Sequence, residues 1–118
     1  MTAEVLKLLK ETRTVLERGW TQEVYARDAN GHVIYPENKD ACQWCISGAL
    51  RKASRFSDYD DAEKLPPGYP EAYRAILSAC PDFDLVRYND EEGRTQADVL
   101  DLMSRAISRV DNKTEASS

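Results

Sequence analysis

The sequence of 118 residues is poor in the side chains that most often carry enzyme chemistry, with one histidine and three cysteines. An odd number of cysteines in a chain of this size does not fit a disulfide-dense scaffold, so we expect reduced thiols. A cysteine nucleophile needs a base within hydrogen-bonding reach, and nothing in the sequence brings the one histidine, His32, to a cysteine. We therefore do not expect a cysteine–histidine enzyme.

The sequence also lacks any apolar run near the ~18 residues that a membrane span needs, and its first residues lack the apolar segment of a signal peptide. We expect a cytoplasmic protein without a membrane partner. Basic residues are outnumbered, 16 against 21 acidic ones, which gives a net charge of −5. A direct nucleic-acid partner is not expected, because phosphate binding needs a basic face. An acidic chain can instead meet a basic surface on another protein.

What the sequence does have is an ordinary globular composition, with 42% hydrophobic and 31% charged residues. A chain of this length supports one domain with a core of its own. It contains no internal repeat and no linker long enough to divide it. We predict a single domain over residues 1–110, followed by a frayed polar tail over residues 111–118.

Three segments outside the middle of the chain have the apolar spacing of amphipathic helices. The first covers residues 3–18 and precedes a glycine suited to a helix end. The second begins at Pro70, since proline is favoured in the first turn. The third follows Thr95, which should cap it, with Asp98 completing a capping box. We predict that residues 57–69 form a polar surface loop and that residues 81–88 are irregular or extended.

The middle of the chain predicts a fourth helix and a hairpin. The helix should run over residues 41–56 with Asp40 as its N-cap. Asn30-Gly31 between β-prone residues is a strong hairpin signal, and it predicts strands over 24–28 and 32–35. A lone hairpin is marginal in water, so it should pack on the helices with the two tryptophans. The fold class is therefore mainly α (α+β), with four main helices and a small antiparallel hairpin.

Cys42 and Cys45 form a C-x-x-C pair at the expected start of the central helix, where free N–H groups can stabilise a thiolate. Redox enzymes use this arrangement, but here no βαβ pattern surrounds it and both sulfurs fall on the predicted core face. Buried free cysteines behave mostly as small apolar residues, which is the reading we favour. An alternative is a zinc site made of Cys42, Cys45, Cys80 and His32, although Cys80 and His32 lack paired ligand spacing.

Charged residues suggest two further features. The acidic runs around Asp58–Glu63 and Asp90–Glu92 lack the spacing of an EF-hand and fit solvated loops. Gly93-Arg94-Thr95-Gln96 puts an arginine just before a helix, which suits an anion site, although Thr95 acting simply as a cap is the preferred reading. If Arg27 or Arg94 reaches Asp28 or Asp90, a polar network would tie the hairpin, the central helix and the last loop together.

Several short motifs together resemble a family of small bacterial and phage-associated domains of unknown function. They are Trp20-Thr21-Gln22, Ala26-Arg27-Asp28, Trp44-Cys45, Gly48-Ala49-Leu50, Asn89-Asp90 and Gly93-Arg94-Thr95-Gln96. The resemblance covers about residues 3–110, and in its pattern the position of Cys45 is typically cysteine whereas that of Cys42 is not. It implies one shared arrangement of polar and aromatic residues, either a binding site or a network that holds the fold.

We therefore expect a non-enzymatic interaction module without a cofactor, since no acid–base or nucleophile set is assembled. Its partner should be a protein, with a small-molecule ligand as the alternative, and one version is a phage-type accessory protein whose acidic surface engages a host protein. The competing hypothesis is a thiol- or metal-dependent protein that uses Cys42, Cys45 and Cys80. Whether the chain is a monomer or a homodimer is left open. The candidate partner-binding residues are Trp20, Gln22, Arg27, Asp28, Trp44, Asn89, Asp90, Arg94 and Gln96.

Overall fold

The computed structural model describes residues 2–55 and 65–117, and it is mainly helical with a small antiparallel sheet, as the sequence predicts. The described part contains four longer helices, one short helix, a 3-10 turn and two short strands. In chain order they are α1 (Thr2–Arg18), β1 (Ala26–Arg27), β2 (Gln43–Trp44), α2 (Ile46–Ser54), α3 (Tyr69–Ala79), η2 (Pro81–Phe83), α4 (Leu85–Asp90) and α5 (Gln96–Ser117).

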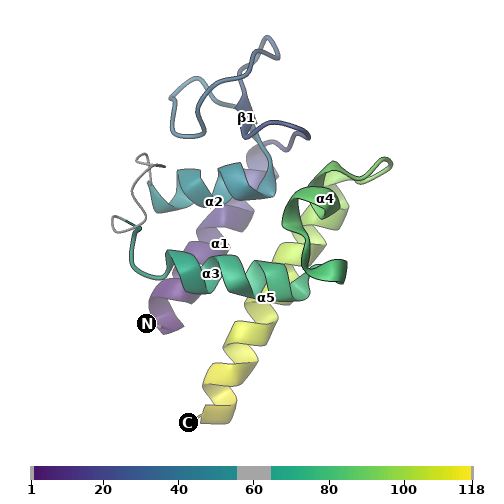
Figure 1. Ribbon diagram of the computed structural model, residues 1–118. Coiled ribbons are helices and arrows are strands. Elements are labelled where there is room, and N and C mark those ends of the chain that lie inside the picture. Colours follow the sequence, from purple (N-terminus) through teal and green to yellow (C-terminus); the bar gives the residue numbers. More distant parts are fainter. Residues whose placement is uncertain (1, 56–64, 118) are drawn as a thin grey trace.

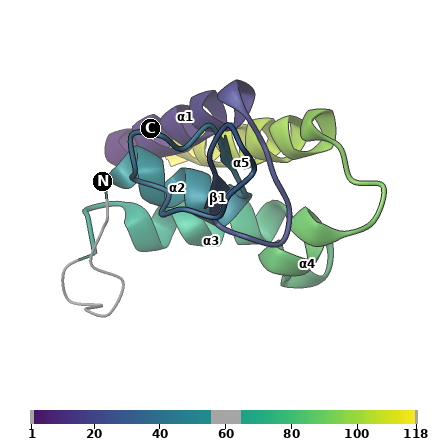
Figure 2. The same ribbon diagram turned by 90° about the horizontal axis from the view of Figure 1, so that it is seen from above.

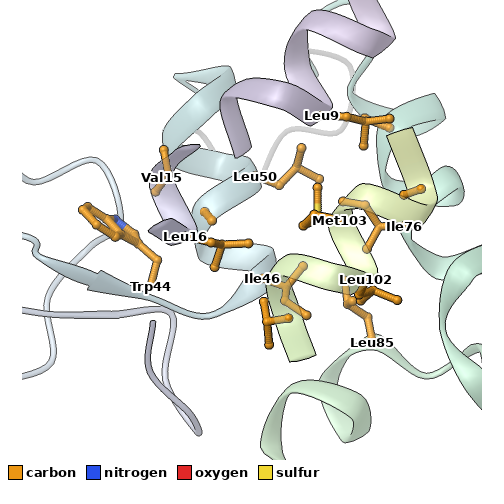
Figure 3. Packing of buried hydrophobic residues seen from close by; sticks show 14 of the residues in the cluster. Leu9, Val15, Leu16, Trp44, Ile46, Leu50, Ile76, Leu85, Leu102 and Met103 are labelled. Carbon is orange, nitrogen blue, oxygen red and sulfur yellow. The ribbon is translucent and has the colours of Figure 1, made fainter. Parts of the chain in front are cut away.

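The four longer helices, which we call the helical half, enclose the core. α1 packs against α2 and α5, and α3 packs against α5 (Figure 1). Large side chains from all four elements are fully buried in one cluster (Figure 3): Leu9, Leu16, Ile46, Leu50, Ile76, Leu102 and Met103. Burying one such side chain stabilises the fold by about 1.5–3 kcal/mol, so this cluster is the main source of stability.

The rest of the chain between α1 and α2, residues 19–45, forms what we call the hairpin end. It lies at the top of Figure 1, away from both termini, and in the view from above its loops pass over α2, with α1 and α3 to either side (Figure 2). Trp44 is its one large buried hydrophobic side chain, and it lies to one side of the main cluster (Figure 3).

Two predicted helix boundaries are confirmed. α1 covers the predicted 3–18 segment, and α5 begins with the capping box. There, the Thr95 N–H donates to Asp98 Oδ2 at 3.1 Å and the Asp98 N–H donates to Thr95 Oγ1 at 3.2 Å. α5 then continues past residue 110, the predicted end of the domain, as far as Ser117.

The predicted start of the central helix is wrong. α2 begins at Ile46 with Cys45 as its N-cap, not after Asp40. The preceding residues are drawn into extended backbone pairing instead: the Cys42 N–H donates to the Arg27 carbonyl at 2.9 Å, and the Trp44 N–H donates to the Gly19 carbonyl at 3.2 Å. Contacts distant in sequence thus override the local helical pattern.

The predicted hairpin is present in its turn and in the antiparallel pairing of its two segments, but this pairing is shorter than predicted. Gly31 adopts φ 83° in the Asn-Gly turn, and its N–H donates to the Asp28 carbonyl at 3.0 Å. The returning segment forms an antiparallel bridge, Arg27 to Val33, where the Asp28 N–H donates to the His32 carbonyl at 2.9 Å and the Ile34 N–H donates to the Ala26 carbonyl at 3.1 Å. The strand partner of β1 is β2, with Ala26 opposite Trp44, and Trp44 also bridges Trp20.

The segment over 81–88 is also misread from the sequence, because it forms η2 and most of α4. The Asp84 side chain caps α4 by accepting a hydrogen bond from the Arg87 N–H. Such a single turn of helix is too short to show an apolar period. The acidic run Asp58–Glu63 lies outside the described residues. Within the described chain, no helix combines the length and apolar character needed to cross a membrane.

Candidate functional site

Asn89, near the end of α4, is the centre of a hydrogen-bond network that joins three parts of the chain. Its Oδ1 accepts from Trp20 Nε1 at 2.9 Å and from the Ile46 N–H at 3.0 Å. Its Nδ2 donates to the Thr21 carbonyl at 3.2 Å and to Asp90 Oδ1 at 2.9 Å. The side-chain amide therefore uses both acceptor positions and both donors. Asn89 is 3% exposed, so this group has no capacity left for a ligand.

Gln22 and Asp90 add a second set of bonds between the same segments. Gln22 Nε2 donates to the carbonyls of Asn89 at 3.1 Å and Glu91 at 3.0 Å, which lie at the C-terminal end of α4. Asp90 Oδ1 accepts from the Glu23 N–H at 2.8 Å. The segment after α1 is thereby fixed to α4 through its backbone as well as through Trp20.

Two glycines allow close backbone contacts at the hairpin end, one between the hairpin end and α2 and one within the hairpin end itself. A Cβ at Gly48 in α2 would lie 2.0 Å from the Tyr25 carbonyl oxygen, and a Cβ at Gly19 would lie 2.0 Å from the Cys42 carbonyl oxygen. No side chain fits in either space. The glycine inside the helical pattern is therefore explained by a close backbone contact, not by a ligand.

Trp44, Arg27 and Asp28 serve the hairpin end itself. Trp44 is fully buried, and its Nε1 donates to the Pro36 carbonyl at 3.0 Å. Arg27 donates to Thr21 Oγ1 and to the Gly31 carbonyl, both at 3.0 Å. Hydrogen bonds from the backbone N–H groups of His32 and Asn30 lower the pKa of the Asp28 carboxyl.

Arg94 and Gln96 hold the loop before α5. Arg94 Nε donates to the Tyr88 carbonyl at 2.8 Å, its guanidinium pairs with the Glu91 carboxylate, and it lies 3.8 Å from the centroid of the Tyr88 ring. Gln96 Nε2 donates to the Leu16 carbonyl at 2.8 Å, near the end of α1. The arginine considered for an anion site is thus engaged by protein groups.

A polar network joins these segments, but it is not formed by the arginine–aspartate contacts that the sequence analysis considered. The described contacts of Arg27 and Arg94 run to Thr21, Gly31, Tyr88, Glu91 and Asp98, and do not include an ion pair with Asp28 or Asp90. The neutral amide of Asn89 makes the junction instead. A short helix that the sequence analysis did not predict carries this residue, so its role was not visible from spacing.

The cysteines lie in different settings. Cys45 Sγ accepts a hydrogen bond from the Gly48 N–H at 3.2 Å, and burial raises the pKa of this thiol. Burial also raises the pKa of the Cys80 thiol, to about 11. Both groups are therefore protonated, weakly nucleophilic thiols at neutral pH. Across residues 2–55 and 65–117, no three His, Cys, Asp or Glu side chains form a group that could hold a metal ion. Cys42, Cys45, Cys80 and His32 thus do not assemble the alternative zinc site.

A solvent-exposed groove and a smaller cavity lie beside this hydrogen-bond network. A groove of about 710 Å³ is lined by residues of the hairpin end, including Tyr25, Val33 and Tyr35, which are 47%, 62% and 68% exposed. A smaller cavity of about 260 Å³ adjoins it, and the two share Glu23, Val24 and Tyr25. Asn89 and Asp90 are the residues from the predicted binding set that line the cavity.

The sequence analysis treated Tyr25, Val33 and Tyr35 as strand residues and did not consider them for binding. The spacing of Val33 and Tyr35 in the sequence could have indicated an exposed apolar face. Val33 and Tyr35 are separated by two positions, so in extended backbone they lie on one face. In the described part of the chain no further strand covers this face, and both side chains are exposed to solvent.

Comparison with known protein families assigns the chain to one of them. A model for a family of unknown function, DUF6197, matches residues 1–109, and the chain belongs to this family. No match was found among curated proteins or among solved structures.

Proposed function

We propose that this member of the DUF6197 family is a protein-interaction module that binds a partner protein through the groove at the hairpin end. The observation that carries the proposal is the exposure of three large side chains, Tyr25, Val33 and Tyr35, along one groove. Exposed apolar side chains that gather in one place, rather than singly, mark interaction surfaces. Tyrosine is also among the residues enriched where proteins bind one another.

The internal network favours binding at this groove over chemistry at the motif residues. Asn89 has every hydrogen-bonding position occupied, and Trp44 is fully buried. These residues position the hairpin end, while the groove beside them stays open. A rigid surface loses less conformational entropy on binding, which supports a role for the network in holding the groove ready.

Charge favours a basic partner. The chain carries a net charge of −5, Glu23 lines the groove, and Asp90 at the end of α4 lines the adjoining cavity. Electrostatic complementarity of this kind speeds association and selects partners. A cytoplasmic, phage-associated accessory protein that engages a basic surface of a host protein is the specific form of the proposal.

Site-specific photo-crosslinking in the native host tests the proposal. A photoreactive phenylalanine analogue replaces Tyr35 in the groove, and in a matched variant it replaces Arg74, which is exposed on α3. We expect a discrete crosslinked protein from position 35 and none of the same mass from position 74. Adding Val33→Asp to the first variant should abolish that product, because a charge in the groove disrupts apolar contact.

Two outcomes would overturn the proposal. One is the absence of any crosslinked protein at position 35 in the native host. The other is the same set of products from positions 35 and 74, which would indicate random encounters. Circular dichroism and thermal unfolding of each variant confirm that the fold is retained before crosslinking.

A further inference from the structure

The cavity next to the groove has a size that suits one side chain. Its volume of about 260 Å³ lies below the range of about 300–1,000 Å³ typical of pockets for small-molecule ligands. Glu23, Val24 and Tyr25 line both the cavity and the groove, so a protein segment seated in the groove lies next to the cavity. A side chain from that segment is therefore the natural occupant.

Part of the lining of the cavity is apolar. Val24 comes from the hairpin end, and Leu85 and Val86 come from α4. Leu85 is buried, whereas Val86 is 63% exposed. These groups offer contact to an aliphatic chain along its length.

The charged residues that line the cavity in the described part of the chain are acidic. Glu23 and Asp90 both line it, and among the lining residues that the structure describes none is a lysine or arginine. The ion pairs of the described part of the chain also leave both carboxylates out. Asp90 is held in place, since its Oδ1 accepts from the Glu23 N–H at 2.8 Å and from Asn89 Nδ2 at 2.9 Å.

The start of α2 also borders the cavity, and a helix N-terminus would ordinarily attract an anion. Here two N–H groups of its first turn are used within the protein. The Ile46 N–H donates to Asn89 Oδ1, and the Gly48 N–H donates to Cys45 Sγ. Arg51 lies over the Tyr25 ring, 4.4 Å from its centroid, and does not line the cavity. The fixed carboxylate of Asp90 therefore sets the sign of the charge that fits.

We propose that the cavity receives a lysine or arginine side chain of the partner protein that binds the groove. The aliphatic stem lies against Val24, Leu85 and Val86, and the cationic group reaches the carboxylate of Asp90. Both side chains have an apolar stem and a charged end, which matches this combination of walls. The inference rests on the proposed function and adds the chemistry of the residue recognised.

A random peptide library displayed on phage and selected on the full-length protein tests the inference. Selected peptides are synthesised and measured by titration calorimetry against wild type and against D90N, Tyr35→Ser and Glu92→Gln. D90N keeps an oxygen that accepts the two observed hydrogen bonds and removes only the charge. Glu92→Gln is the matched control, because it removes the same charge from an exposed neighbour that does not line the cavity.

The expected result is a set of peptides that share a lysine or arginine next to apolar residues. Their affinity should fall about tenfold on D90N and stay nearly unchanged on Glu92→Gln, and replacing the basic residue by norleucine should cost wild-type binding a similar factor. Binding should also weaken as salt is raised.

Three outcomes would overturn it, and they separate the inference from the proposed function. Peptides that bind wild type and D90N equally but lose binding to Tyr35→Ser would support binding at the groove and contradict the recognition of a basic side chain by Asp90. Equal losses on D90N and Glu92→Gln would replace the cavity by a long-range charge effect. A selection that yields no peptide sensitive to Tyr35→Ser would contradict both the proposed binding at the groove and the recognition of a basic side chain in the cavity.

Discussion

The helical half and the hairpin end are held by different forces. In the helical half, fully buried leucine, isoleucine and methionine side chains from four helices form one cluster. Between residues 19 and 45, the buried hydrophobic residues are Ala26, Ala41 and Trp44, and each strand is two residues long. The hairpin end instead depends on directional hydrogen bonds to Asn89 and on close backbone contacts at Gly19 and Gly48.

The difference teaches where the molecule is sensitive. Apolar packing is spread over many contacts, so one change is shared among neighbours. A hydrogen-bond junction concentrates its effect, because losing one member leaves buried partners unpaired. The groove lies on the hairpin end, which is held by the hydrogen-bond network. We therefore expect changes in this network to alter partner binding by changing the shape of the groove.

The largest expected effect is that of Asn89→Ala. It leaves the Trp20 indole N–H and the Ile46 N–H without their acceptor. Each buried unpaired donor costs about 1–3 kcal/mol, so we expect the free energy of unfolding to fall by about 3 kcal/mol. Chemical denaturation monitored by circular dichroism measures this. Asn112→Ala, at an exposed position of α5, is the control and should change stability by less than about 0.5 kcal/mol.

Gly48→Ala tests the close approach of the two regions. Inside a helix, replacing glycine by alanine ordinarily stabilises by about 1 kcal/mol. Here the new Cβ would meet the Tyr25 carbonyl oxygen at 2.0 Å, so we expect a loss of about 2 kcal/mol. Denaturation of this variant beside Ser47→Ala in the same turn separates the contact from helix propensity. A gain in stability at position 48 would show that the two backbones are not in contact.

Trp20→Phe should have a smaller effect. It removes one donor from Asn89 Oδ1, which keeps the Ile46 N–H, so we expect a loss of about 1 kcal/mol. Trp44→Phe should cost more, because that ring is fully buried and its Nε1 bond to the Pro36 carbonyl is lost as well. Thermal unfolding of both variants orders them. The reverse order would mean that Trp20 contributes more than Trp44 to the stability of the hairpin end.

The smallest expected effects are those of pH on the free energy of unfolding. Low pH acts on the hairpin end through Asp28, and high pH acts on the helical half through Cys80. The folded pKa of Asp28 is lowered below its ordinary 3.8, so its contribution is present above that value and is lost as pH falls through the folded pKa. The pKa of Cys80 is raised from 9.0 to about 11, so the unfolded thiol ionises first and stability declines as pH rises between these values. Denaturation curves of Cys80→Ala should lack the alkaline component, and those of Asp28→Asn the acid one.

The contrast between the regions also explains what the sequence could predict. α1 and α5 were predicted because each buries one stripe at helical spacing, and the Thr95–Asp98 box is a local signal. The start of α2 was predicted wrongly because the pairing of residues 42–45 with Gly19, Tyr25 and Arg27 depends on contacts distant in sequence. Asn89 could be singled out by a motif, but its position as the junction required the short helix α4, which has no periodic pattern.

Hydrogen exchange in wild type and Asn89→Ala tests most directly whether this one side chain holds the hairpin end. The amides to compare are those of Thr21, Trp44 and Cys45, which bond within the hairpin end, and those of Leu9 and Met103 in the helical half. We predict that protection falls further at the first three than at the last two, because the hairpin end opens while α1 and α5 stay packed. An equal fall in both regions, or no change at the hairpin end, would contradict the account.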